Sequence, residues 1–214
     1  MSAREDVLAR VRASLTDVTE PDWPVAWAYG APTPMTDVVD RFEETVTDYK
    51  ATVVRCSAAQ VPGQVVRGLT GTGARTVVLP AGADEQLRRA LEMAADLSVR
   101  VDDGSLTAAD LDATDAVVTA SSVGIAETGT IVLDHGPGQG RRALSLVPDR
   151  HICLVRAADV VSDVPEAVTR LADSVRAGSP LTWISGPSAT SDIELSRVEG
   201  VHGPRHLWVI LIDE

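Results

Sequence analysis

Short apolar runs alternate with amphipathic stretches along the first half of the chain. The amphipathic stretches repeat their apolar residues at helical spacing, whereas the short runs are rich in valine. Strands alternating with helices of this length are typical of right-handed βαβ units and a mainly parallel sheet. The predicted strands are 51–55, 76–80 and 99–101, and the predicted helices are 36–49, 58–69 and 84–97.

The second half has a different pattern. Two apolar runs, 115–120 and 130–135, are joined by a link too short for a helical crossover, so we expect them to pair antiparallel. A helix is predicted over 164–177, with Asp163 before it and Gly178 after it. Further strands are predicted at 151–155, 181–185 and 207–213, and the last is apolar throughout, as in a strand covered on both faces.

The N-terminal segment is expected to be separate from this pattern. Ser2 and Glu5 have capping-box spacing ahead of a helical apolar stripe. Residues 19–35 contain four prolines, which favour an extended arm. Trp23 and Trp27 in this arm either anchor it on its own domain or bind a partner. The predicted division is a helix and arm over 1–35 and one domain over 36–214.

Composition limits the class of protein. The chain has 214 residues, of which 44% are hydrophobic and 23% charged, which is typical of a globular α/β protein with a sizeable core. It contains no apolar run of the roughly 18–20 residues that span a bilayer. The first residues carry charges and lack an apolar signal core, so we expect a cytoplasmic protein without a membrane span.

Charge and cysteine content exclude other classes. The net charge is −12, and a chain this acidic is repelled by nucleic acids, although a local arginine cluster can still bind a small anion. Cys56 and Cys153 are far apart and belong to no metal-binding pattern, so no iron–sulfur cluster or zinc is expected in this chain. His202 and His206 flank Gly203-Pro204, which breaks any helix that would direct both at one metal ion.

The first segment with candidate chemistry is Gly124–Thr130. Glu127 lies between glycine and threonine residues and between two strands, where a carboxylate can act as a base, a nucleophile or a ligand anchor. The alternative is a turn in which Glu127 caps backbone amides. The candidate ligand-binding residues here are Thr128, Gly129 and Thr130.

The second candidate segment is 185–194. It follows an apolar run, which predicts a position at the carboxyl end of a parallel strand, where open α/β sheets bind ligands. Asp192 and Glu194 oppose anion binding there, and a capped turn is the alternative. The candidate ligand-binding residues are Ser185, Gly186, Ser188, Thr190 and Asp192.

The third candidate segment is 135–142, in which glycines precede Arg141 and Arg142. Such a loop can close over a phosphate or carboxylate, or it can be an exposed hairpin with solvated arginines. We expect Glu127 and Ser188 to approach one shared cleft, with either arginine supplying positive charge. The glycines of 68–73 do not form GxGxxG, so no dinucleotide fingerprint is present.

Four blocks in the second half carry a family resemblance. GIAETGTIVLD (124–134), SLVPDRHI (145–152), SGPSATSDIE (185–194) and GVHGPRHLWVIL (200–211) resemble, in order and spacing, the lactate utilization protein C family, the LUD domain. The resemblance assigns 36–214 to that domain and adds His202 to the candidate ligand-binding residues. It implies a Rossmann-like three-layer sandwich related to the NagB/RpiA/CoA-transferase superfamily.

The resemblance also implies a function. The family takes part in oxidising L-lactate to pyruvate together with two iron–sulfur proteins, which would hold the clusters that this chain lacks. We therefore expect an accessory subunit that binds a small carboxylate or a partner. The alternatives are a stand-alone enzyme acting on a CoA ester or sugar phosphate through Glu127, by analogy with CoA-transferases, and a purely structural subunit.

Two positions depart from the family pattern. Trp208 stands where a histidine is expected, so a catalytic histidine there is not transferable. Ser191 stands where alanine is common, which adds a hydroxyl.

Overall fold

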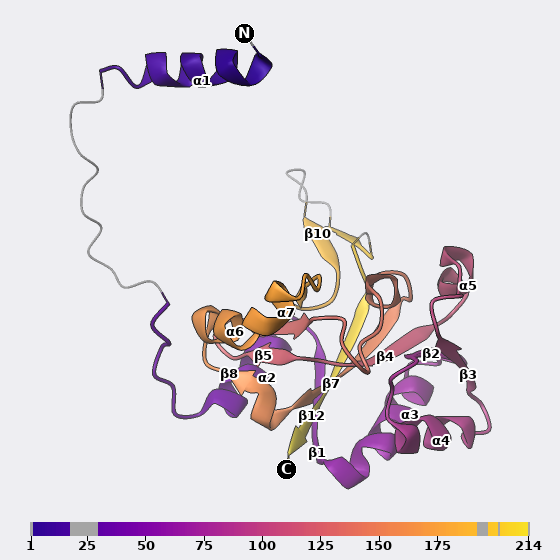
Figure 1. Cartoon of the computed structure of the whole chain (residues 1–214). Helices are drawn as coiled ribbons and strands as arrows, with labels where there is room; N and C mark the ends of the chain where they lie inside the picture. Colours follow the sequence, from indigo (N-terminus) through magenta and orange to yellow (C-terminus); the bar gives the residue numbers. More distant parts are fainter. Residues whose placement is uncertain (1, 18–29, 192–196, 201, 214) are drawn as a thin grey trace.

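A fully parallel six-stranded sheet forms the centre of the protein, as the computed structural model shows (Figure 1). The structure describes residues 2–17, 30–191, 197–200 and 202–213, with the backbone alone over 189–191 and 197–199. The prediction of a mainly parallel sheet in an α/β fold is confirmed. In sheet order the strands are β1 (Thr52–Ser57), β12 (His206–Asp213), β7 (Arg150–Arg156), β4 (Ala116–Ala120), β2 (Thr76–Pro80) and β3 (Ser98–Asp102).

Helices cover one face of this sheet. Asp84 caps α4 (Glu85–Glu92) by accepting a hydrogen bond from the Leu87 amide at 2.9 Å. The apolar stripes of α4 and of α3 (Val61–Gly71) pack onto alternate side chains of the central strands, among them Ile152 and Ile210. A short 3-10 turn, η1 (Ala58–Gln60), leads into α3. Helix α5 (Ala108–Asp112) precedes β4 and packs Leu111 on the other face, against Val78 and Val117.

A second sheet, which the sequence did not predict, covers part of the other face. Its order is β8 (Val160–Val161), β5 (Val123–Ile125), β6 (Thr130–Leu133) and β9 (Thr182–Ile184). On β6, Ile131 and Leu133 face the core shared with the large sheet, whereas Val132 faces the core beneath α6. The helices on this side are α2 (Val38–Asp48), α6 (Val164–Arg170) and α7 (Ala172–Arg176), with the 3-10 turns η2 (Arg142–Ser145) and η3 (Ala157–Asp159).

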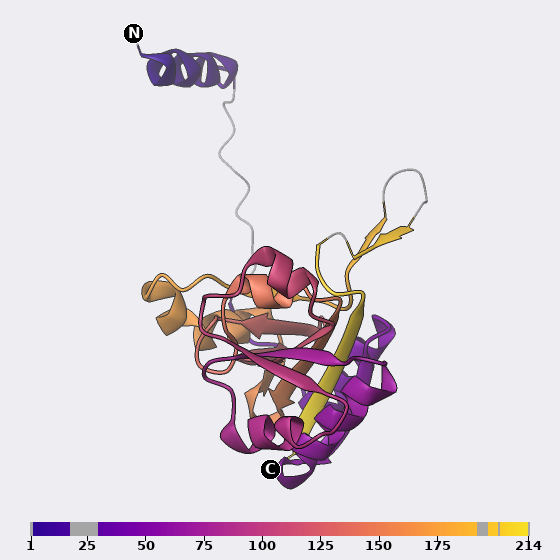
Figure 2. The same cartoon turned by 90° about the vertical axis from the view of Figure 1, so that its right-hand side faces the viewer.

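Two pairing predictions were wrong. The strand at 115–120 is β4 of the large parallel sheet, and the antiparallel partner of β6 is β5, which lies in the expected link. The strand at 181–185 is β9, which pairs antiparallel with β6. The segment after β9 therefore does not leave a parallel strand. The antiparallel hairpin β10 (Ala189–Ser191) and β11 (Arg197–Glu199) follows it and projects from the body (Figure 2).

The N-terminal helix α1 (Ala3–Ser14) has the capping box that the sequence predicts, since the Ser2 and Glu5 side chains each bond the other's backbone amide. It buries none of its residues. Trp23 and Trp27 lie outside the described residues, but Thr33 at the end of the arm donates its amide to Asp163. Among the described helices, none has the length and apolarity needed to cross a membrane.

Candidate functional site

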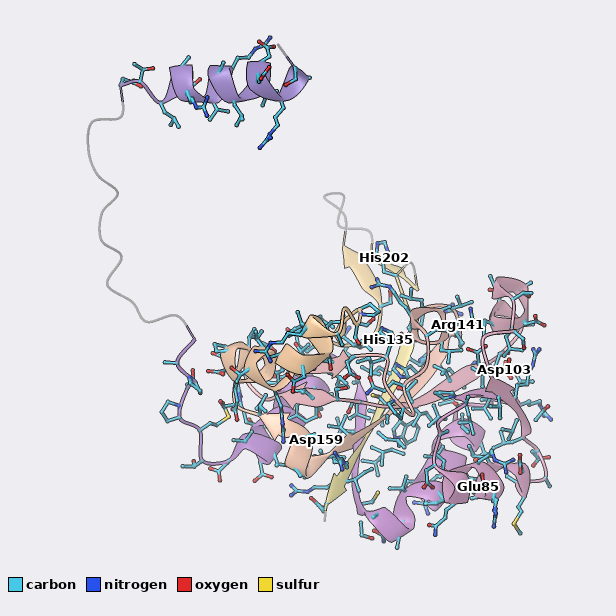
Figure 3. The ribbon with its side chains drawn as sticks, viewed as in Figure 1. Glu85, Asp103, His135, Arg141, Asp159 and His202 are labelled. Carbon is cyan, nitrogen blue, oxygen red and sulfur yellow. The ribbon has the colours of Figure 1, made fainter. Side chains whose placement is uncertain are left out.

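A pocket of about 280 Å³ opens where three loops meet the start of β7 and β12. The loops are η2, the segment 185–188 after β9, and the segment 202–204 before β12. His202, on the last loop, lies next to the β10–β11 hairpin (Figure 3). The polar side chains that line the pocket come from Arg142, Ser145, His151, Thr182, Ser185, Ser188 and His202.

Backbone hydrogen bonds fix two of these loops to each other. The Ser188 amide donates to the Pro204 carbonyl at 2.8 Å, and the His202 amide donates to Ser188 Oγ at 3.1 Å. Gly186 has a positive φ of 90°, and a Cβ there would lie 2.6 Å from Tyr49 Cβ. The close approach of α2 thus requires glycine at this position. Ser188 is held in place with its neighbours rather than free in a surface loop.

His151 is the most deeply buried polar side chain of the pocket, at 1% exposure. Its Nε2 lies 2.8 Å from Thr119 Oγ1, which in turn lies 3.8 Å from Cys153 Sγ. Its Nδ1 is buried and has no hydrogen-bond partner among the described residues. Burial lowers the pKa of His151 to about 4, so the ring is neutral at neutral pH. A neutral imidazole with one unpartnered nitrogen therefore borders the pocket.

The two adjacent arginines have different roles. Arg141 pairs with the buried carboxylate of Asp102, with Nε 2.8 Å from Oδ2 and Nη2 3.0 Å from Oδ1. The guanidinium holds the pKa of Asp102 below its usual range. Arg142 lines the pocket and has no ion pair within the described part of the chain. Arg142, and not Arg141, brings positive charge to this pocket.

The first candidate segment reaches the pocket through hydroxyl groups. Thr128 Oγ1 lies 2.7 Å from Thr130 Oγ1, which lies 2.7 Å from Ser185 Oγ. Gly129 has a positive φ of 59°, and a Cβ there would lie 2.8 Å from the Thr45 carbonyl, so glycine is needed for packing on α2. Thr128 and Thr130 thus help to position the Ser185 side chain through this series of hydroxyl contacts.

Glu127 itself is exposed and does not line the pocket. Its amide donates to the Ser162 carbonyl at 3.0 Å, while its carboxylate has no hydrogen bond or ion pair with the described residues. The structure therefore shows neither the capping role nor a carboxylate in a cleft shared with Ser188. A catalytic role for Glu127 stays a prediction. Of the other candidates, Thr190 is described by its backbone alone and Asp192 lies outside the described residues.

Sequence reasoning missed His151 as a site residue. The available signal was a histidine at the start of the apolar run 151–155, because a buried polar side chain needs a bonding partner. His135 is structural, with Nδ1 2.7 Å from the Gly140 carbonyl oxygen and Nε2 2.8 Å from Thr182 Oγ1. The described residues contain no group of three or more histidine, cysteine or acidic side chains placed to hold a metal ion.

Comparison with known proteins gives consistent results. The family model for the LUD domain matches residues 39–212. A protein named lactate utilization protein C from Deinococcus radiodurans is 49% identical over 186 residues, covering 86% of this chain and 84% of the relative. A protein of the same name from Geobacillus thermodenitrificans is 26% identical over 215 residues, covering 94% and 89%.

The fold also matches a solved structure. The crystal structure of a DUF162 family protein from Deinococcus radiodurans superposes with a TM-score of 0.71 at 42% sequence identity. The match covers 84% of this chain and 99% of that protein.

Proposed function

Because the chain belongs to the LUD domain family, we propose that it serves in lactate utilization and that the pocket beside His151 binds a small carboxylate. Its relatives carry the name lactate utilization protein C. The finer proposal is an accessory subunit in the oxidation of L-lactate to pyruvate. The observation that carries it is that Arg142, which has no ion pair with the described residues, lines the same pocket as the buried, neutral His151.

The pocket suits a small 2-hydroxy or 2-oxo acid in charge and hydrogen bonding. The Arg142 guanidinium supplies the positive charge that a carboxylate requires on a protein of net charge −12. The hydroxyls of Ser145, Ser185 and Ser188 line the same space and can donate to its oxygens.

We infer that each neutral tautomer of His151 suits one of the two acids, one tautomer accepting a hydrogen bond from a 2-hydroxy acid and the other donating one to a 2-oxo acid. If Nε2 carries the proton and donates to Thr119, Nδ1 accepts a hydrogen bond from a 2-hydroxyl, as in L-lactate. If Thr119 donates to Nε2, Nδ1 carries the proton and donates to a 2-oxo group, as in pyruvate. The same ring can therefore bind substrate and product without becoming charged.

Partner subunits are part of this proposal. Cys56 and Cys153 are both buried, and they belong to the cores on opposite faces of the large sheet. These two thiols cannot ligate one cluster together. We place the iron–sulfur clusters in two partner proteins, and this chain beside them as the carboxylate-binding subunit.

Binding of L-lactate and pyruvate, measured by calorimetry, tests the pocket. Arg142→Gln should weaken binding about tenfold or more, because a charged hydrogen bond contributes about 1.5–3 kcal/mol. Arg89→Gln is the matched control, since Arg89 pairs with Glu85 on α4, well away from His202 (Figure 3). Equal affinities of Arg142→Gln and the wild type would refute the site.

Growth tests the role. Deletion of the gene should abolish growth on L-lactate and leave growth on pyruvate unchanged. Expression of the Arg89→Gln chain in the deletion strain should restore growth on L-lactate. A deletion strain without a second copy that still grows normally on L-lactate would remove the lactate role, whatever the pocket binds.

Glu127→Gln tests the remaining catalytic candidate. The side chain is exposed and its carboxylate has no partner among the described residues, so the free energy of unfolding should change by less than about 0.5 kcal/mol. Loss of growth on L-lactate with unchanged stability would then assign chemistry to this carboxylate. Normal growth would leave Glu127 as a turn residue.

A further inference from the structure

A second cavity lies at the same end of the large sheet as the carboxylate pocket and shares the lining residues His151 and Leu207 with it. Its volume is about 120 Å³. Ile152 and Trp208 line only the second cavity and belong to the core beneath α3, whereas the shared Leu207 belongs to the core on the other face. The residues used below are Lys50, Thr72, Arg150, Arg205, His206 and Trp208.

Basic side chains gather at this cavity in an otherwise acidic chain. Lys50 is the single lysine of a protein with a net charge of −12, and it lines the cavity with Arg150, Arg205 and His206. Lys50 and Arg150 have no ion pair within the described part of the chain, while Arg205 pairs with Asp149 at 2.6 Å. The excess positive charge favours an anion here.

Two groups near the cavity would repel an anion, the carbonyl groups at the end of α3 and the carboxylate of Asp149, and both accept hydrogen bonds from neighbouring side chains. The C-terminal end of α3 reaches the cavity at Thr72, and carbonyl groups at a helix end repel anions. The Thr72 hydroxyl donates to the Gly68 and Leu69 carbonyls, at 3.0 and 2.9 Å. The carboxylate of Asp149 is bonded by Arg205 through both oxygens. Neither group leaves an unopposed negative charge beside Lys50.

Trp208 supplies a donor without an acceptor. Its Nε1 is buried and has no hydrogen-bond partner among the described residues. The indole packs against α3 at Gly68, where a Cβ would lie 3.4 Å from Trp208 Cδ2 and 3.2 Å from Ile152 Cδ1. An indole nitrogen can only donate, so a bound acceptor is needed to satisfy it.

Lys50 has an unusual backbone for a lysine. Its φ is 66°, in the left-handed region that favours glycine and asparagine. Its amide donates to the Thr47 carbonyl at 2.8 Å, and this hydrogen bond closes the turn that follows α2. A long cationic side chain at this strained position beside the cavity points to a use for its charge.

We propose that this cavity binds a small oxyanion of the phosphate class, either free phosphate or the phosphate group of a monoester. The cavity is too small for a nucleotide and suits a group of a few heavy atoms. Lys50 and Arg150 supply the charge, and Trp208 Nε1 donates to one oxygen. Its charged residues differ from those of the carboxylate pocket, although His151 and Leu207 line both cavities, and the proposal does not rest on the lactate role.

The indole resonance of Trp208 in the full chain reports on the site. In ¹H–¹⁵N spectra it is assigned by its loss in Trp208→Phe. Titration with inorganic phosphate at constant ionic strength should shift this resonance to saturation. Lys50→Asn, which tolerates the positive φ, and Arg150→Gln should each weaken binding about tenfold. Arg142→Gln and Arg89→Gln should leave the affinity unchanged.

Three outcomes would overturn the proposal. One is a Trp208 resonance that does not move with phosphate. Another is a shift that persists with unchanged affinity in both Lys50→Asn and Arg150→Gln. The third is loss of phosphate binding in Arg142→Gln, which would place the anion in the carboxylate pocket. Methyl phosphate separates the two sources: equal affinity indicates a phosphate ester, and binding of inorganic phosphate alone indicates the free ion.

Discussion

His151 shows how one buried polar side chain links stability to the pocket. The ring lies on the face of β7 that packs toward the small sheet, in line with Cys153 and Val155. Thr119 on the neighbouring strand satisfies one ring nitrogen, the other is buried without a partner among the described residues, and the residue lines the pocket. Charging this ring is costly because the surroundings exclude water. The fold therefore holds a neutral donor or acceptor where the proposed ligand binds.

The lowered pKa makes stability depend on pH. Between about 4 and the ordinary value of 6.5, the unfolded chain binds a proton at His151 that the folded chain excludes, so acid favours unfolding in this window. We expect the free energy of unfolding in urea to be about 2 kcal/mol lower at pH 5 than at pH 7. The carboxylates with lowered pKa, such as Asp102, lose their contribution only at lower pH.

His151→Asn is the variant that isolates this effect. It keeps a polar group near Thr119 and removes the titration, so its stability should change much less between pH 7 and pH 5. His202→Asn, at the exposed rim of the pocket, is the control and should retain the wild-type dependence. An unchanged pH dependence in His151→Asn would assign the acid sensitivity to other groups.

Residue identity alone did not separate Arg141 from Arg142. The sequence predicted that either would supply charge, since two adjacent arginines follow a glycine-rich turn. Arg141 forms an ion pair with Asp102, the last residue of β3, which lies 39 positions earlier in the chain. The tertiary fold brings Asp102 next to Arg141, so no local sequence pattern indicates this ion pair. The candidate hydroxyl residues Thr128, Thr130 and Ser185 lie within hydrogen-bond distance of one another, and their role in ligand binding stays a prediction.

At the scale of elements, the large sheet was predictable and the small sheet was not. The strands of the large sheet are five to eight residues long and mostly apolar, so their pattern is strong. Strands β6 and β9 lie within the strands predicted at 130–135 and 181–185, whereas β8 and β5 have only two and three residues, too few for a clear alternation. Their pairing joins segments such as β6 and β9, about fifty positions apart in sequence, which no local signal records.

Gly129 connects the small sheet to α2 and gives a test of this packing. Gly129→Ala should lower the free energy of unfolding by about 1–3 kcal/mol, because the Cβ would lie 2.8 Å from the Thr45 carbonyl at a φ of 59°. Gly63→Ala in α3 is the control, since a Cβ there meets no atom within 4 Å and alanine favours a helix. Urea unfolding that shows equal effects for both would contradict the packing.

At the scale of the whole molecule, the site joins segments that are distant in sequence. Arg142, His151, Ser185 and His202 come from different loops and strands of both sheets. The family blocks identified in the sequence contain the last three, and the fold brings these three blocks to one pocket. The N-terminal helix is different, because it adds nothing to either core.

Helix α1 is therefore the element that we expect to bind a partner subunit. Its apolar stripe is exposed at Val7 (59%), Leu8 (38%), Val11 (50%) and Leu15 (55%). An isolated helix of 12 residues is marginally stable in water, so a surface that covers this stripe would stabilise it. Deleting residues 2–17 should leave the free energy of unfolding of the domain within about 0.5 kcal/mol of the full chain, because α1 buries no residue.

The same deletion should abolish co-purification with the two proposed iron–sulfur proteins, detected by their visible absorbance and by mass spectrometry. Val7→Ser with Val11→Ser in the full chain should reproduce the loss, since these residues lie one above the other on the helix. Arg10→Gln, at an exposed ion pair of the same helix, should not. A truncated chain that retains both partners would show that they bind the domain itself, and α1 would then have no part in assembly.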